Sequence, residues 1–128
     1  MIKITLPLPR YTKAGRSKML TMNDYRNIHY RVSAQAKRDY TEISILNLLS
    51  HRRKHFDAVT ILYRFFFETN VRRDIGNIGA VTDKFFSDAL VKVGIIEDDD
   101  YKIVRSVTYE FGGIGPERVE IYIMQSDE

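Results

Sequence analysis

The sequence predicts an α+β domain, in which two helices pack on a mostly antiparallel sheet in the order β-α-β-α-β-β. Apolar and polar residues alternate over 2–8, as in a half-buried strand. Apolar residues recur every three or four positions over 33–54 and 77–93, as on the buried face of a helix. A run of β-branched and aromatic residues over 58–68 favours a central strand. The length of 128 residues suits a single domain with one core.

The first strand is expected to stop at its prolines, which cannot donate to a β-ladder. The polar segment that follows, 9–32, shows no clear period. An irregular segment of that length in a compact domain is often functional. Its basic and tyrosine residues predict a flexible arm or loop that orders on nucleic acid.

The remaining elements follow from capping and turn signals. Ser33 is expected to cap the first helix, which ends near the basic triplet 52–54. The second helix is expected from about Asn77 to Val93, with Gly94 as its stop. Two strands, at 103–111 and 119–124, are expected to form a hairpin across glycine-rich residues 112–116. The core stripe predicted for the first helix consists of Ala36, Tyr40, Ile43, Leu46 and Leu49.

Composition excludes several classes of protein. Without cysteine the chain has no disulfide scaffold, thiol nucleophile or thiolate zinc site. Its three histidines show no metal-ligand spacing. We find no apolar run that suits a signal peptide or a membrane span, and therefore expect a soluble protein of the cytoplasm with no membrane partner.

Positive charge is concentrated in the first quarter of the chain, although the net charge is only +3. Taken singly, each basic cluster is best explained as a solvated surface. Together, beside a group of carboxylates, they favour a protein that neutralises phosphates. The residues expected to bind nucleic acid are Arg10, Lys13, Arg16, Lys18, Arg72 and Arg73.

Acidic residues at the two ends of the second helix suggest a divalent-metal site, because hard cations prefer oxygen ligands. On a helical wheel, Lys84 and Asp88 share a polar sector near the direction of Asp74, whereas Asp83 lies roughly opposite and is the poorer ligand. The turn after the helix could bring Asp98 or Asp99 to the same side. Each residue also has an ordinary structural explanation, as a helix cap, a solvated helix residue or an exposed turn.

The stretch from 72 to 100 resembles the RusA family of Holliday-junction resolvases, which are small dimeric Mg²⁺-dependent endonucleases. The resemblance lies in Arg-Arg-Asp-Ile-Gly-Asn at 72–77, Asp-Lys-Phe-Phe-Ser-Asp-Ala-Leu at 83–90 and Gly-Ile-Ile-Glu-Asp-Asp-Asp at 94–100. By this resemblance Asp74 and Asp99 correspond to catalytic metal ligands, and Lys84 to the helix lysine required for cleavage. Mn²⁺ is a possible substitute for Mg²⁺.

One position departs from that family. Gly76 stands where family members usually carry a second carboxylate, and the helix also has about four additional residues before Lys84. Asp98, Asp88 or Asp83 could supply the missing ligand, and Asp98 needs the least rearrangement because it adjoins Asp99. If Asp74 is a ligand, Asp74→Asn should abolish cutting and Gly76→Asp should restore or raise it.

The resemblance implies hydrolysis of phosphodiester bonds in four-way DNA by a two-fold dimer, during recombination and repair. The alternative is a branched-nucleic-acid-binding dimer whose catalysis was weakened or lost when position 76 became glycine. A third possibility is an interaction protein with no nucleic-acid role.

Overall fold

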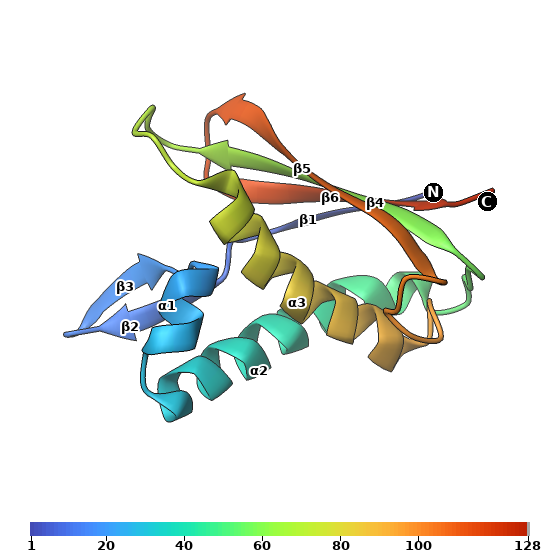
Figure 1. The fold of residues 1–128 in the computed structure, drawn as a ribbon, viewed down its shortest axis with the longest axis horizontal. Coiled ribbons are helices and arrows are strands. Elements are labelled where there is room, and N and C mark those ends of the chain that lie inside the picture. The colour runs from blue at the N-terminus through green and yellow to red at the C-terminus, as the bar shows by residue number, and fades with distance from the viewer. Residues whose placement is uncertain (128) are drawn as a thin grey trace.

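The structure, a computed structural model, describes residues 1–127. It is an α+β fold in which a four-stranded sheet is covered on one face by two long helices (Figure 1). A separate two-stranded hairpin and a short helix lie beside them. The elements are β1 (Ile2–Leu6), β2 (Arg10–Lys13), β3 (Arg16–Met19), α1 (Met22–Asn27), α2 (Tyr30–Leu48), a 3₁₀ turn (Leu49–His51), β4 (Val59–Phe67), α3 (Ile75–Val93), β5 (Val104–Ile114) and β6 (Arg118–Gln125).

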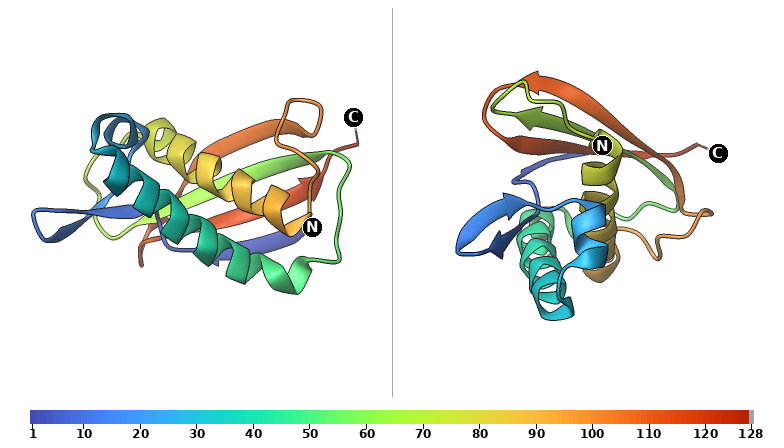
Figure 2. Two further views of the ribbon diagram at one scale, coloured as in Figure 1. Left: turned by 90° about the horizontal axis from the view of Figure 1, so that it is seen from below. Right: turned by 60° about the vertical axis from the view of Figure 1, so that its left-hand side comes forward.

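The sheet has the order β1-β6-β4-β5, and only the β4–β5 pair is parallel. The mostly antiparallel sheet predicted from sequence is therefore confirmed. β4 is a central strand, also as predicted, and its side chains alternate strictly between buried and half-buried. Its buried side contributes Val59, Ile61, Tyr63, Phe65 and Phe67 to the core. Figure 2 shows α2 and α3 side by side over that face, leaving the other face of the sheet uncovered.

The predicted hairpin between the last two strands is wrong. β5 and β6 both exist, but they pair with opposite edges of β4. The crossover through α3 makes β5 parallel to β4, so β6 takes the other side and also pairs with β1. The glycine-rich connection passes the end of β4, where the Gly115 amide donates to the Phe67 carbonyl (2.9 Å).

The segment 9–32, expected to be an irregular arm, instead contains β2, β3 and α1. Ala14 (φ 50°) and Gly15 (φ 76°) form the two-residue turn between β2 and β3, and two positive φ angles are typical of a type I′ hairpin turn. Tyr11 and Leu20 are buried, which anchors the segment to the core. The structural signal in the sequence was the short Ala-Gly turn between two four-residue strands.

The predicted helix from Ser33 begins earlier and buries a different face. α2 starts at Tyr30, where the His29 side chain caps the Arg31 amide (3.1 Å). Ala36 and Tyr40 are buried as expected, but Ile43, Leu46 and Leu49 are exposed. The face toward the core instead carries Thr41, Ser44 and Leu48. Within residues 1–127, none of the helices combines the length and the apolar character that crossing a bilayer requires.

α3 carries three of the candidate site residues, Asp83, Lys84 and Asp88. Its first turn is capped by Asp74, whose Oδ1 accepts a hydrogen bond from the Asn77 amide (3.1 Å). It ends at Gly94, as predicted, because the left-handed conformation there (φ 88°) favours glycine. The buried pair Ile95 and Ile96 then reverses the chain toward β5.

Candidate active site

The residues predicted to share a catalytic site lie at different points along α3. Asp74 precedes the helix and Lys84 lies ten residues later. At 1.5 Å per residue, these positions are about 15 Å apart along the helix axis. A cation bound by Asp74 would therefore lie far from Lys84, since Mg²⁺ binds its ligands at about 2 Å. The structure therefore does not bring Asp74 together with Lys84.

A pocket of about 390 Å³ beside the second half of α3 does bring several of the predicted residues together. The predicted residues Lys84 and Asp99 both line it, and so do two of the three alternative ligands, Asp83 and Asp88. The remaining lining residues are Lys37, Ser87, Tyr101, Val104 and Val107. We call this the acidic pocket. Its carboxylates come from α3 and from the turn before β5, which are adjacent because Gly94 reverses the chain.

The sequence-based geometric argument against Asp83 is wrong. Asp83 was placed opposite Lys84 and Asp88, yet all three line the acidic pocket. A helical wheel shows only which residues of one helix share a direction. The pocket extends from α3 to β5 and so also reaches residues, such as Asp83, on the edge of the buried face of α3. Asp83 is half-buried there, and its Oδ1 accepts hydrogen bonds from the Tyr63 hydroxyl (2.6 Å) and the Ser87 hydroxyl (3.0 Å).

The protonation of Asp83 reflects this environment. Burial raises the pKa of the Asp83 carboxyl, because a low-dielectric environment disfavours the charged form. The hydrogen bonds from Tyr63 and Ser87 lower that pKa in part, and the negative charge of Asp99 raises it again. A carboxylate that is largely desolvated and close to a second one is a candidate functional group.

Asp88 is neutralised from the neighbouring helix. Its Oδ2 forms an ion pair with Lys37 Nζ of α2 (3.0 Å), and the hydrogen bond to Asp88 raises the pKa of Lys37. The sequence offered no indication that Lys37 belongs to the site, because it lies on another helix 46 or more residues before the other pocket-lining residues that bear charge. The pocket is thereby left with Asp83 and Asp99 as carboxylates without a cationic partner among residues 1–127.

The acidic turn after α3 positions Asp99 toward the pocket. Asp98 Oδ1 accepts from the Asp99 amide (2.8 Å), and Asp100 Oδ1 accepts from the Lys102 amide (2.9 Å). These are the hydrogen bonds of ordinary turn residues. Asp98, the alternative expected to need the least rearrangement, is exposed and does not line the pocket.

Asp74 and Gly76 belong to the other end of α3. Asp74 lines a separate pocket of about 390 Å³ with Arg10, Arg73, Asn77 and Glu117. Glu117 is already paired with Arg10 (2.7 Å), and Asp74 caps the helix. A side chain at position 76 would begin about 3.4 Å from Asp74 Oδ1, so an aspartate there would join this end of the molecule.

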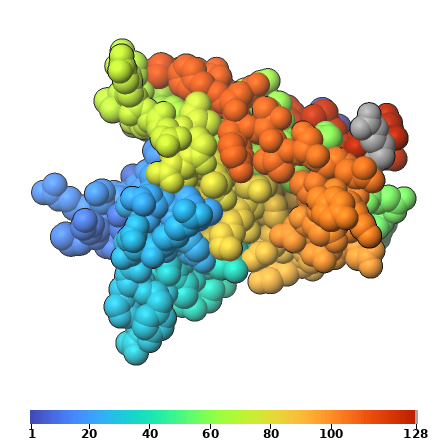
Figure 3. Space-filling model, in the orientation of Figure 1, coloured from blue at the N-terminus to red at the C-terminus, as the bar shows by residue number. Residues whose placement is uncertain are grey.

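The basic residues expected to bind DNA gather at the same end as Asp74. Lys13, Arg16 and Lys18 are exposed on the β2–β3 hairpin, which projects from one end of the molecule, whereas the turn before β5 lies at the other (Figure 3). Arg72 is exposed as well. Arg73 is engaged locally, since its guanidinium donates to the Thr69 and Val71 carbonyls (3.1 and 2.9 Å).

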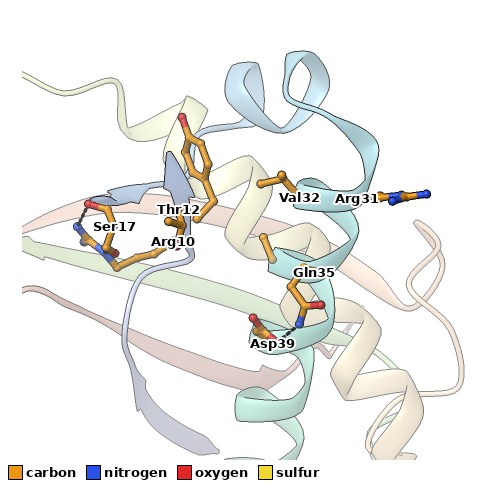
Figure 4. A pocket seen from close by; sticks show the side chains of 9 residues that line it. Arg10, Thr12, Ser17, Arg31, Val32, Gln35 and Asp39 are labelled. Atoms are coloured by element: carbon orange, nitrogen blue, oxygen red, sulfur yellow. Dashed lines mark hydrogen bonds between the residues drawn. The ribbon is translucent and has the colours of Figure 1, made fainter. Parts of the chain in front are cut away.

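A further pocket of about 370 Å³ lies between the hairpin and α2 (Figure 4). Four of its polar side chains are paired with one another: Arg10 Nε donates to Ser17 Oγ (2.8 Å), and Gln35 donates to Asp39 (2.7 Å). Of the residues expected to bind or cleave nucleic acid, Arg10 alone lines this pocket. This pocket therefore contains none of the residues predicted to be catalytic.

The acidic pocket fits Mg²⁺ better than it fits a metal with an all-protein cage. No group of three or more histidine, cysteine, aspartate or glutamate side chains in residues 1–127 is arranged to hold a metal ion. Mg²⁺, however, commonly uses one or two carboxylates together with water and substrate phosphates. Asp83 and Asp99 supply that number of oxygen ligands, and Lys84 in the same pocket makes no ion pair with any residue in 1–127.

Asp83→Asn is expected to stabilise the metal-free protein at neutral pH, by about 1 kcal/mol or about 4 °C in melting temperature. Asparagine can accept the same two hydrogen bonds without a desolvated charge. The native pKa of Asp83 is raised, so the folded state binds the proton more tightly than the unfolded state. The wild type should therefore regain stability as pH falls through that pKa toward about 4, and the advantage of the variant should shrink.

Thermal unfolding in the presence of EDTA, at pH values from 7 down to 4, measures this difference. Glu42→Gln, which removes an exposed carboxylate on α2 that does not line the pocket, controls for general effects of pH on the assay. An Asp83→Asn variant that melts below the wild type at pH 7 would contradict the expectation.

Comparison of the sequence with protein-family models finds no match, and comparison with curated proteins finds none either.

Proposed function

We propose that the protein is a Mg²⁺-dependent endodeoxyribonuclease that cleaves four-way DNA junctions. The observation that supports this most is the acidic pocket, in which two carboxylates without a cationic partner, Asp83 and Asp99, lie with the unpaired Lys84. Oxygen ligands beside a free ammonium group suit phosphodiester hydrolysis, in which negative charge grows on a phosphate. The proposal retains Lys84 and Asp99 from the family resemblance and exchanges Asp74 for Asp83.

In this mechanism Asp83 and Asp99 would hold Mg²⁺, which supplies an activated water and stabilises the departing 3′ oxygen. Lys84 would offset the charge that develops on the phosphorane. The Lys37–Asp88 ion pair limits the negative charge of the pocket, which lowers the repulsion that an incoming phosphate meets. Tyr101, exposed at the rim, offers a ring on which an unpaired base could stack.

The basic hairpin would contact DNA away from the site of cleavage. A junction is broad enough to lie along α3, with one backbone at the acidic pocket and another at Lys13, Arg16 and Lys18. Contacts of this kind depend on counterion release, so binding should weaken steeply with salt. A homodimer would present two such sites to the two symmetric strands of the junction. Ile43, Leu46 and Leu49 are exposed apolar residues on α2 and its 3₁₀ extension that such a dimer could bury.

The proposal is tested by incubating the full chain with a synthetic four-way junction, and with a duplex of equal length, in Mg²⁺, Mn²⁺ or EDTA. We expect paired symmetric nicks in the junction with either metal, and none in EDTA or in the duplex. A junction that is bound but never cut at any metal concentration would refute the nuclease. Sedimentation of the protein alone would show whether it is a dimer.

The second candidate is a junction-binding dimer that has lost catalysis. It is favoured by the lack of a three-ligand group among residues 1–127 and by Gly76, which lies next to Asp74 and far from the acidic pocket. Metal-independent binding to the junction without cleavage would identify it. Equal affinity for junction and duplex would contradict both the nuclease and the junction-binding dimer.

A further inference from the structure

The fully buried residue Tyr63 is hydrogen-bonded to a carboxylate, that of Asp83. Tyr63 lies on β4 with no exposed surface, and rings of Phe65, Phe86 and Tyr109 surround it with centroids 5.8–6.4 Å away. These rings hold the Tyr63 side chain in one orientation, which fixes the position of its hydroxyl. A buried phenol requires a hydrogen-bond partner. That partner is the carboxylate of Asp83 (2.6 Å).

A neutral acceptor would satisfy such a phenol at lower cost, and the protein uses one elsewhere. The buried Tyr40 donates to the backbone carbonyl of Pro7 (2.7 Å). Pairing Tyr63 with a largely buried carboxylate instead requires desolvation of a charge, which is costly. If the interaction served only to satisfy Tyr63, a carboxylate would be a poor choice. The arrangement is explained better if the carboxylate itself is what must be held in place.

Both hydrogen bonds to Asp83 end on the same oxygen. The Tyr63 and Ser87 hydroxyls donate to Oδ1, and no residue in 1–127 donates to Oδ2. Within residues 1–127, Thr41 Oγ1 is the one buried side-chain oxygen or nitrogen without a partner. Asp83 Oδ2 is therefore open to solvent, on a side chain that lines the acidic pocket with Asp99.

We propose that Tyr63 and Ser87 are positioning residues, which hold the Asp83 carboxylate by Oδ1 so that Oδ2 ligates a divalent cation together with Asp99. The two hydroxyls come from different elements, β4 and α3, and so fix both the position and the rotation of the carboxylate. Hydrogen-bond partners of metal ligands orient the ligand and strengthen metal binding. The inference rests on the proposed function only in treating the acidic pocket as a cation site.

The test is a Mn²⁺ titration of the full chain without DNA, with free Mn²⁺ measured by electron paramagnetic resonance. The wild type should bind Mn²⁺, and Asp83→Asn should abolish the binding. Tyr63→Phe and Ser87→Ala should each weaken the affinity by about tenfold or more, because loss of such partners typically costs 10- to 100-fold. Tyr40→Phe is the matched control, since it also removes one hydroxyl bond from a buried tyrosine, and should leave Mn²⁺ affinity unchanged.

Thermal unfolding of the same variants separates positioning from stability. Both tyrosine variants should lose stability, but only Tyr63→Phe should lose Mn²⁺ affinity. The inference is overturned if Tyr63→Phe and Ser87→Ala bind Mn²⁺ like the wild type, if Tyr40→Phe weakens binding equally, or if the wild type binds none. A protein that binds Mn²⁺ in this pattern without cutting junctions would keep the inference and refute the nuclease. If Tyr63→Phe leaves both junction cleavage and Mn²⁺ affinity unchanged, the nuclease proposal is kept and the inference is refuted.

Discussion

Replacing Asp83 with asparagine is expected to lower Mg²⁺-dependent cleavage of a four-way junction by at least about 100-fold and to leave junction binding intact. Loss of a hydrogen-bond partner of a metal ligand already costs about 10- to 100-fold, so loss of a ligand itself should cost more. The acidic pocket contains only one other carboxylate without a cationic partner, Asp99, among residues 1–127. Asp99→Asn should therefore have a similar effect. Single-turnover cleavage and gel-shift measurements in EDTA separate the two steps.

Asp74→Asn is the control for this experiment, because Asp74 lies about 15 Å from Lys84 along α3. It should lower stability by only about 0.5 kcal/mol, because asparagine also caps a helix and only the interaction of the charge with the helix dipole is lost, and it should leave cleavage nearly unchanged. Gly76→Asp should likewise leave cleavage unchanged, since the new carboxylate would lie beside Asp74. If instead Asp74→Asn abolishes cutting and Gly76→Asp raises it, the site follows the family resemblance and the acidic pocket is not catalytic.

Gly79→Ala is expected to destabilise the protein by about 2 kcal/mol, which corresponds to a decrease of about 8 °C in melting temperature. A Cβ atom at this position would lie 2.5 Å from Cγ of Tyr109, so either the tyrosine must change its χ1 rotamer or strand β5 must shift. Overpacking of this kind costs up to about 3 kcal/mol, and replacing glycine by alanine in a helix returns only about 1 kcal/mol. The steric effect therefore outweighs the gain in helix propensity.

Gly76→Ala is the matched control in the same helix. Its Cβ would meet nothing closer than Asp74 Oδ1, at 3.4 Å, so it should be neutral or slightly stabilising. Tyr109→Ala combined with Gly79→Ala should cost less than the sum of the two single changes, because removing the ring removes the clash. Chemical denaturation of the wild type and the four variants measures these differences. A Gly79→Ala variant as stable as Gly76→Ala would show that β5 accommodates the added methyl group.

Gly79 illustrates what a helical pattern cannot report. Its presence in α3 reduces helix propensity, and the sequence alone offers no reason for it. The structure supplies the reason, which is the close approach of Tyr109 from β5. Burial, together with the smaller effect of the charge of Asp83 one turn after Gly79, raises the pKa of the Tyr109 hydroxyl to about 12. The glycine thus allows β5 to close over the part of α3 that carries the acidic pocket.

The sequence predicted which charged residues belong to the candidate site better than it predicted which of them lie together in one pocket. Lys84 and Asp99 were expected together and line one pocket, because Gly94 was a clear helix stop and the chain had to reverse there. Asp74 and Lys84 were expected together from a helical wheel. A wheel reports direction around the axis and ignores the distance along it, which here is about 15 Å. The same wheel ranked Asp83 as the poorer ligand, because a wheel contains no information about β5.

The sequence by itself determined the elements that depend on local periodicity and turn chemistry, such as the first strand, the central strand and the limits of α3 near Gly94. Tertiary structure alone decided which strands pair with β4, which face of α2 is buried, and that Lys37 neutralises Asp88. These features depend on contacts between residues far apart in the chain, for which no periodic signal exists. The hydroxyl of Tyr63 reaches Asp83 for the same reason, since it is the crossing of β4 and α3 that brings them together.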